Sequence, residues 1–497
     1  MVYGSLMDLF RTKSIEQSLS DTEEPEFKLK RTLTALDLTV FGVGVIIGAG
    51  IFTLTGAVAQ ANAGPGVVFS FVLAAVCCGL AALCYAEFAS TVPVSGSAYT
   101  FSYATLGELI AWIIGWDLLL EMMLGASVVA QGWASYFETF LDQIGITWPS
   151  GIGYGDTFNL PAFLLVVILT ALVAYGIKES LRVNLVLVGL KVFIVLFVII
   201  AGIQFIDTDN YKPFVPPAES VEGGGETLHT PLLQLITGSP QAYGVMGIIF
   251  AASLVFFAYI GFDVVATTAE EAANPQKDLP RGIIGSLVIC TILYVAVALV
   301  ITGMVKYSEI DPAAALANAF VAQGRDGYAT LISAGAVAGL TTVVMTLIIG
   351  AIRVTFAMCR DNLLPRSFAH VTPSTGTPLR ITIAIGVLVA LVASLTPIGK
   401  LEEMVNIGTL TAFALVSLAV PILRKRRPDL KRSFQVPFSP VLPWLSAAIC
   451  VFLMLNLTVE TWLRFLVWMA LGFAIYFFYG YKNSRVGRGV AEAGQRV

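Results

Sequence analysis

Four glycines fall within nine residues of the first long apolar stretch, at Gly42, Gly44, Gly48 and Gly50. Each glycine disfavours a helix by roughly 0.5–1 kcal/mol relative to alanine, so this segment is a poor uniform helix. One interpretation is close helix packing through the Gly44-x-x-x-Gly48 spacing. The other is a break at 48–50, where backbone N–H and C=O groups lose their helical partners and become available to a solute.

A second irregular stretch lies five apolar segments later, where Gly261 and Asp263 interrupt the run 243–268 before it ends in polar residues. Free N–H groups at the start of a half-helix favour a carboxylate, and free C=O groups at the end of one favour an ammonium group. Two such breaks that face each other would hold both ends of a zwitterion. The chemistry therefore favours an α-amino acid.

Several ionisable residues fall inside apolar segments, where a charge costs ~2.5–3.5 kcal/mol on insertion scales and needs a reason. We expect Lys191 to carry a proton; a fixed structural cation and a side chain that reaches the membrane surface are the alternatives. Asp263 is interpreted either as a gating or proton-coupling group or as a helix cap. Glu121 shares a helical face with Asp117 and is expected to line the pocket.

Three further features have a structural interpretation beside a functional one. Met345 is expected to pack ordinarily or, if it faces the pocket, to limit the volume of a bound side chain. Glu87 is expected to form an ion pair rather than to bind a ligand. The six bases between Arg424 and Arg432 orient the chain and could contact anionic lipid headgroups.

Composition limits the class of protein that can position these residues. Of 497 residues, 57% are hydrophobic and 12% charged, whereas soluble domains carry about 25% charged residues. A soluble globule and a disordered chain are excluded, and a net charge of −4 argues against nucleic acid as a partner. The sequence has no nucleophile–base pair, metal-ligand cluster or phosphate loop, so we expect no enzyme, metal or cofactor.

Twelve apolar segments are long enough to be membrane helices, and they lack the period-two alternation of barrel strands. They are 35–60, 65–89, 99–133, 161–177, 183–204, 243–268, 282–305, 329–358, 380–397, 402–422, 441–459 and 462–481. A unit of five helices crosses the membrane an odd number of times. A second copy that follows it in the chain must therefore be inverted. Irregular segments at positions 1 and 6 are what an inverted repeat with a midplane site predicts.

The basic residues orient this all-α integral membrane fold. With the N-terminus in the cytoplasm, 22 of the 29 basic residues fall in cytoplasmic segments and five in outer ones. The predicted organisation is a cytoplasmic tail (1–34), a first five-helix repeat (35–204), an extracellular loop (205–242), a second, inverted repeat (243–422), a basic cytoplasmic loop (423–440), helices 11 and 12 (441–481) and a cytoplasmic tail (482–497).

Several motifs resemble the amino acid–polyamine–organocation (APC) superfamily. The sequence GAGIF at 48–52 resembles its G-[STA]-G-I-F signature, and YAE at 85–87 with PVSGSAY at 93–99 resembles its second signature. The sequences GFD at 261–263, ATT at 266–268 and EEAANPQK at 270–277 resemble the cationic amino acid transporter branch, as does GWDLLLE at 115–121. The motifs occur in order along segments 1 to 10.

The resemblance implies an inverted 5+5 repeat with broken helices 1 and 6 and two additional helices, 12 transmembrane helices in all. It assigns Gly48, Ala49 and Gly50, within the motif that includes Ile51, as backbone donors to a substrate carboxylate. It assigns the carbonyls of Ile46, Phe257, Ala258 and Ile260 to the substrate amine, and the ring of Phe257 to a gate.

The resemblance also places Lys191 where sodium-driven relatives bind sodium, so no sodium is expected. Two departures separate the chain from animal members of the branch, which have fourteen spans and lack this lysine. Small neutral amino acids are therefore as compatible with the sequence as cationic ones.

The sequence thus predicts a secondary active transporter that imports L-amino acids across the cell (plasma or inner) membrane by alternating access, coupled to protons. An exchanger of the same fold is the first alternative, and a membrane-embedded amino acid sensor or channel the second. Expected partners are the amino acid and membrane lipids, with anionic lipid or sterol at the helix surfaces and a small single-span subunit as further candidates.

Overall fold

The computed structural model describes residues 11–12, 33–91, 97–176, 181–220, 227–237, 241–268, 272–372 and 375–488. The predicted cytoplasmic tails, 1–34 and 482–497, lie largely outside these ranges. Parts of two sequence motifs, at 93–96 and 270–271, also lie outside the described residues.

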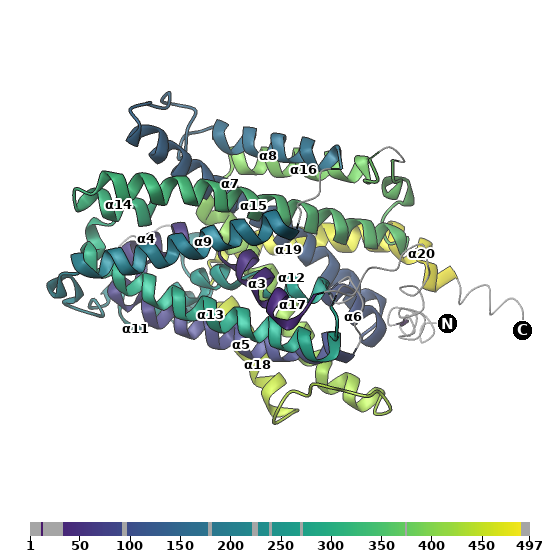
Figure 1. The fold of residues 1–497 in the computed structure, drawn as a ribbon. Helices are drawn as coiled ribbons and strands as arrows, with labels where there is room; N and C mark the ends of the chain where they lie inside the picture. Colours follow the sequence, from purple (N-terminus) through teal and green to yellow (C-terminus); the bar gives the residue numbers. More distant parts are fainter. Residues whose placement is uncertain are drawn as a thin grey trace, which may run out of the picture.

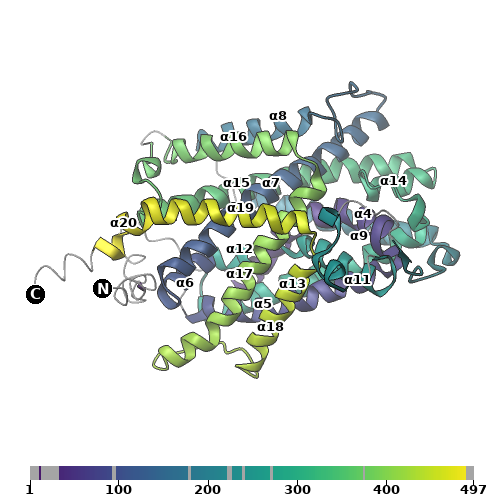
Figure 2. The same ribbon diagram turned by 180° about the vertical axis from the view of Figure 1, so that it is seen from behind.

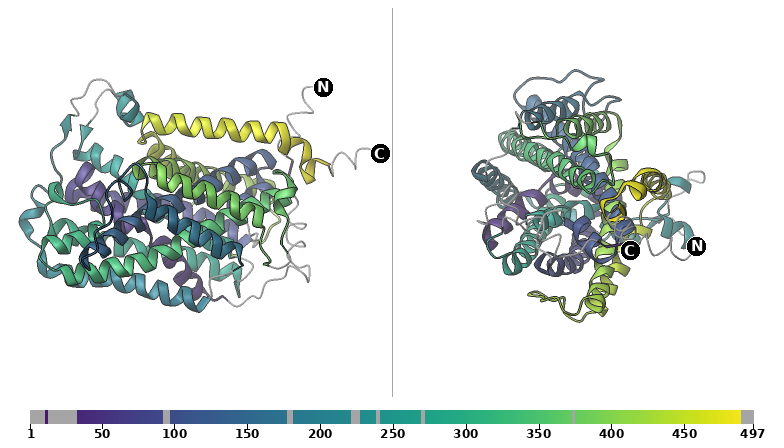
Figure 3. Two further views of the ribbon diagram at one scale, coloured as in Figure 1. Left: turned by 90° about the horizontal axis from the view of Figure 1, so that it is seen from above. Right: turned by 90° about the vertical axis from the view of Figure 1, so that its right-hand side faces the viewer.

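Long helices run roughly along one axis and form a bundle (Figure 1). Six of them are α5 (Val67–Thr91), α7 (Glu108–Gln143), α9 (Leu181–Gly202), α13 (Pro275–Met304), α15 (Asp326–Arg360) and α17 (Ile398–Arg426). Shorter apolar helices are α8 (Leu160–Ala174), α16 (Leu379–Leu395), α18 (Val441–Leu455) and α19 (Val459–Ile475), the last along one flank of the bundle (Figure 3).

Eight helical segments of the described residues are long and apolar enough to cross a membrane, and four shorter apolar helices accompany them. Strand pairing in the described part consists of the two-residue strands β1 (Glu219–Ser220) and β2 (Gln241–Ala242) and three isolated β-bridges. The predicted class, a helical multi-pass membrane protein, is therefore confirmed.

Helix formation stops at the two places that the glycines predicted. The first interrupted helix consists of α3 (Ala35–Ile46), a break, the π-helical turn η2 (Gly50–Leu54), α4 (Thr55–Val58) and a second π-helical turn, η3 (Ala59–Ala63). The other consists of α11 (Gly244–Val255), the 3-10 turn η8 (Phe256–Tyr259) and α12 (Phe262–Thr267). Because Ile47 and Ile260 have extended backbone dihedrals, neither helix is continuous.

The predicted third span, 99–133, is wrong at both ends. Residues Ser97–Thr105 form a separate helix, α6, and α7 begins only at Glu108 and continues to Gln143. The chain changes direction at Gly107, whose φ of 103° is accessible to glycine because it lacks a Cβ atom. The connection to α8 is therefore 144–159, shorter than the 134–160 that the predicted spans leave.

Both described end segments lie at one end of the bundle, beside α6 and α20 (Tyr481–Asn483). Helix α14 (Ala315–Ala322), in the connection between α13 and α15, lies with α4 at the opposite end (Figures 1 and 2). The predicted loop 205–242 also contains ordered structure at that end, including α10 (Leu232–Thr237).

Buried carboxylates join distant segments at the end near the termini. Glu108 accepts hydrogen bonds from Arg11 (2.9 and 2.7 Å), from the hydroxyls of Tyr103 (2.8 Å) and Tyr476 (3.0 Å), and from Ser484. The guanidinium of Arg11 also lies over the ring of Tyr481, 4.9 Å from its centroid. This region of the molecule therefore brings together the N-terminal segment, the start of α7 and the C-terminal helices.

Glu87 of α5 accepts two hydrogen bonds from Arg424, at 2.8 and 2.6 Å, and one from the backbone N–H of Val436 at 2.7 Å. The predicted ion pair of Glu87 is confirmed. Arg424 is thus paired with a buried carboxylate of another helix.

Candidate substrate site between the interrupted helices

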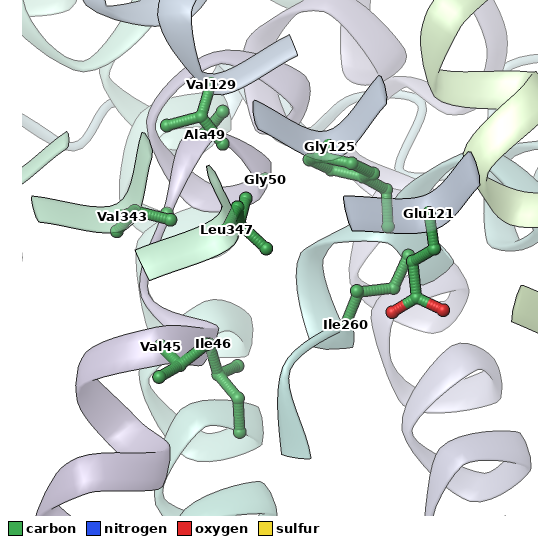
Figure 4. Close-up of a pocket in the computed structure, with 12 residues that line it drawn as sticks. Val45, Ile46, Ala49, Gly50, Glu121, Gly125, Val129, Ile260, Val343 and Leu347 are labelled. Carbon is green, nitrogen blue, oxygen red and sulfur yellow. The ribbon is translucent and has the colours of Figure 1, made fainter. Parts of the chain in front are cut away.

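A small pocket lies between the two interrupted helices, α7 and α15 (Figure 4). Its walls are mostly apolar side chains and exposed backbone. The lining residues are Val45, Ile46, Gly48, Ala49, Gly50, Glu121, Gly125, Val129, Phe257, Ile260, Val343 and Leu347.

The two breaks approach each other closely at Gly50. A Cβ atom at this position would overlap the Cα atom of Ala258, so the close approach requires glycine. On the other side, Gly261 has a φ of 120°, and an added Cβ would lie 2.8 Å from the side chain of Val45. Both glycines are therefore needed for the packing of one break against the other.

The breaks expose backbone groups of opposite polarity. The turn η2 starts at Gly50, and the first N–H groups of a helix have no acceptor within it. The turn η8 and Ile260 follow the end of α11, where carbonyl groups lose their helical donors. The Phe257 carbonyl accepts one bond, from the N–H of Ile260 at 3.2 Å, and keeps a second lone pair.

Three buried side chains from other helices donate to the carbonyl groups released at the breaks. The Tyr294 hydroxyl donates to the Ile46 carbonyl at 2.8 Å, and the Lys191 ammonium donates to the Gly44 carbonyl. The Asn406 amide donates to Ser253 and Leu254, at 2.8 and 3.1 Å. Sequence reasoning missed Tyr294 and Asn406, although each is a hydrogen-bonding side chain within an apolar segment.

Lys191 connects three helices. It lies on α9, binds the end of α3 through Gly44, and packs its methylene chain so close to Gly339 of α15 that a methyl group there would overlap it. The side chain is buried, so it does not extend to the membrane surface. The snorkelling alternative is wrong; the other two remain.

Three carboxylates are buried near the cavity. Glu121 lines it, and neither of its oxygens has a hydrogen-bond partner among the described residues. Asp117, one turn earlier on α7, is likewise buried, and does not line the cavity. Asp263 is fully buried in the first turn of α12, where the positive end of a helix favours a carboxylate.

Seven of the ten predicted substrate-binding residues line the cavity, and Ile51, Ala258 and Met345 do not. Ala258 contacts Gly50 behind the wall, Ile51 is buried in η2, and Met345 is half-buried on α15. Instead of Met345, the wall of α15 is formed by Val343 and Leu347.

Three of the lining residues on α7 follow helical spacing: Glu121, Gly125 and Val129 are each four positions apart. Residues at this spacing share one face of a helix. Given the prediction that Glu121 lines the pocket, this four-residue spacing could have predicted Gly125 and Val129 as well. Figure 4 shows Glu121 on one side of the cavity and Val343 on the other.

Comparison with known proteins gives a consistent result. Residues 33–477 match the family described as "Amino acid permease". The chain is 47% identical to the branched-chain amino acid permease BcaP of Bacillus subtilis, over 96% of this chain and 99% of that protein. It is 44% identical to the methylthioribose transporter of the same organism, with the same coverage. Identity to the vacuolar cationic amino acid transporter 4 of Arabidopsis thaliana is 36%, over 85% of this chain and 68% of that protein.

Proposed function

The chain belongs to the amino acid permeases of the APC superfamily, and we propose that it imports L-amino acids across the cell membrane by alternating access coupled to protons. The observation that carries this proposal is the close approach of two interrupted helices at Gly50 and Ala258, next to a cavity. Backbone donors of 48–50 bind the carboxylate, and carbonyls around Phe257 bind the ammonium group.

The apolar wall supports a substrate with an apolar side chain. Val129, Val343 and Leu347 line the cavity, and Glu121 is the ionisable residue among its lining residues. Apolar pockets discriminate by size and reject polar groups that they cannot pair. The name of the BcaP relative indicates branched-chain amino acids, so valine, isoleucine and leucine are the first substrates to test.

The proton-coupling role rests on the contacts of Lys191. A protonated Lys191 donates to the Gly44 carbonyl near the end of α3, and loss of the proton would remove its charge and weaken that contact. Proton binding would thereby bias the position of α3 relative to α9 and α15. Asp263, in the first turn of α12, is proposed as a second coupling group.

Uptake into proteoliposomes with an imposed proton gradient tests the proposal. We expect labelled valine to accumulate above its external concentration when the outside is acidic, and accumulation to collapse when an uncoupler is added. One charge crossing the membrane supplies ~2.3 kcal/mol per 100 mV, which is enough for more than tenfold accumulation. Uptake that ignores the gradient would exclude proton coupling.

The same vesicles distinguish the two rival functions. An obligate exchanger would take up label only when the vesicles are preloaded with amino acid. A channel would equilibrate valine without concentrating it, and a sensor would bind it without flux. Competition by excess lysine, alanine and methylthioribose would then define the substrate class, with the Glu121→Gln variant showing whether that carboxylate selects cationic side chains.

A further inference from the structure

A buried tyrosine on α7 joins two segments. One is the part of the first interrupted helix that follows the break (η2, α4 and η3), here called its outer half, and the other is α14. The hydroxyl of Tyr136 donates a hydrogen bond to the carbonyl of Phe52 in η2, at 2.6 Å, and accepts one from the backbone N–H of Leu316 in α14, at 3.3 Å. Its ring also meets the ring of Phe52 edge to face, with centroids 5.7 Å apart. Tyr136, Phe52 and Leu316 are all fully buried.

Hydrogen bonds to two neighbouring helices hold the part of α7 that carries this tyrosine. Trp133 donates to Thr341 of α15 at 2.9 Å, and Gln131 donates to the carbonyls of Ala393 and Thr396, at the end of α16, at 3.0 and 2.6 Å. These bonds connect the outer half of α7 to two neighbouring helices. Tyr136 is therefore held from one side while it binds two separate segments on the other.

The two bound segments also pack directly against each other. A Cβ atom at Gly56 of α4 would overlap the side chain of Ala315 in α14 and lie 3.0 Å from the side chain of Ile310. No space remains between the outer half of the helix and α14 at this point. The glycine thus permits the close contact that the Tyr136 hydroxyl connects.

The cluster of Tyr136, Phe52 and Leu316 lies beyond the cavity, at the end of the bundle that carries α14. Tyr136 lies seven residues beyond Val129, which is about 10 Å further along α7 towards the end that carries α14. The buried cluster of Tyr136, Phe52 and Leu316 therefore covers the cavity on the side away from the chain termini. For a solute to enter from that side, the outer half of the helix has to separate from α14 or α7.

We propose that Tyr136 is the latch of the outer gate: its hydroxyl holds the outer half of the first interrupted helix and α14 closed over the cavity. The latch is a positioning residue, since it lines no part of the cavity. Removing the hydroxyl leaves the Phe52 carbonyl without this donor and the Leu316 N–H without this acceptor, and so destabilises the closed state relative to the open one. The inference concerns gating and takes only the direction of entry from the proposed function.

Cysteine accessibility tests the latch. A Val129→Cys substitution places a reporter thiol in the cavity wall, and the six native cysteines are all buried. A membrane-impermeant maleimide is added to the side opposite the termini, in protein reconstituted in one orientation. We expect Tyr136→Phe to raise the labelling rate of the reporter at least about fivefold, the factor for one of the two neutral hydrogen bonds that it loses.

Tyr211→Phe is the matched control. The Tyr211 hydroxyl donates to the Leu299 carbonyl at 2.7 Å, a bond of the same type that does not involve α4, η2 or α14. This variant should label at the parental rate. A parental rate for Tyr136→Phe would overturn the latch, whatever solute the protein carries, because labelling requires no transport.

A second variant disturbs the contact between α4 and α14 without changing Tyr136, so the test does not depend on one substitution. Gly56→Ala should raise reporter labelling in the same direction, because its methyl group would overlap Ala315 in the closed state. Each variant is first compared with the parent by size-exclusion elution. If both substitutions leave a monodisperse protein whose reporter is no more accessible than in the parent, the proposal is wrong.

Discussion

At the scale of single residues, the site depends on a glycine that has no room for a side chain. We predict that Gly50→Ala weakens substrate binding at least tenfold, because its methyl group would overlap Ala258 and force the two breaks apart. A loss of at least tenfold in affinity corresponds to about 1.4 kcal/mol. Isothermal titration of the purified protein with valine measures it.

Gly189→Ala on α9 is the control for this substitution. A Cβ atom at this position would meet no atom within 4 Å beyond its own stretch of helix, so the affinity for valine should not change. Parental affinity in Gly50→Ala would show that the contact between the breaks does not shape the site.

Lys191 provides the second residue-scale prediction. Lys191→Ala removes the donor to the Gly44 carbonyl, and we expect it to abolish gradient-driven accumulation of valine in proteoliposomes. Lys212→Ala is the control, since this lysine pairs with Asp209 at the surface, with 75% of its side chain exposed. Normal accumulation by Lys191→Ala would remove the lysine from the coupling mechanism.

Residues whose own type conflicts with an apolar segment were visible in the sequence. Lys191, Glu121 and Gly50 are examples, since each is costly in a membrane helix and so indicates a specific role. Val343 and Leu347 were not visible, because an apolar side chain in a membrane helix faces a cavity, another helix or lipid with the same sequence signal.

At the scale of elements, interrupted helices need donors from their neighbours. We predict that Asn406→Ala lowers both the melting temperature and the affinity for valine, because the carbonyls of Ser253 and Leu254 lose their donor where α11 ends. An unpaired buried polar group costs about 1–3 kcal/mol. Thermal unfolding with and without valine measures both effects.

Asn456→Ala separates the local effect from general destabilisation. Its amide donates to the Phe452 carbonyl at 2.8 Å at the end of α18, away from both breaks. The control should lower the melting temperature, while the rise in melting temperature that valine causes should stay unchanged. An Asn406→Ala protein with an unchanged increase would show that the end of α11 does not support the site.

The positions of the breaks could be predicted because glycine disfavours helix locally. The boundary between α6 and α7 could not, because a single glycine, Gly107, with its positive φ, marks it. A single glycine in an apolar run is compatible with a continuous helix, whereas four in nine residues are not.

At the scale of the whole molecule, the two ends of the chain are joined through Glu108. We predict that Arg11→Ala destabilises the protein by about 3 kcal/mol, the cost of leaving one member of a buried ion pair alone. The Glu108 side chain is fully buried, whereas that of Arg11 is 13% exposed. In a double-mutant cycle with Glu108→Gln, the combined loss of melting temperature should be smaller than the two single losses together; strict additivity would contradict the pairing.

The membrane class and the helical architecture followed from composition and segment length, which are properties of the sequence alone. Contacts such as Arg11 with the carbonyl of Tyr481, at 2.8 Å, join residues 470 positions apart. No local pattern encodes such pairs, because they depend on how the helices are arranged in three dimensions. The same holds for Tyr294 and Asn406, whose acceptors lie on other helices.

The most direct measurement of the central claim is an experimental density map of the protein in lipid nanodiscs with saturating valine. We predict ligand density between the backbone of 48–50 and that of 257–260, with the carboxylate towards the former and the ammonium group towards the latter. Continuous helical density through residues 46–52 and 255–262, or a ligand bound elsewhere in the molecule, would contradict it.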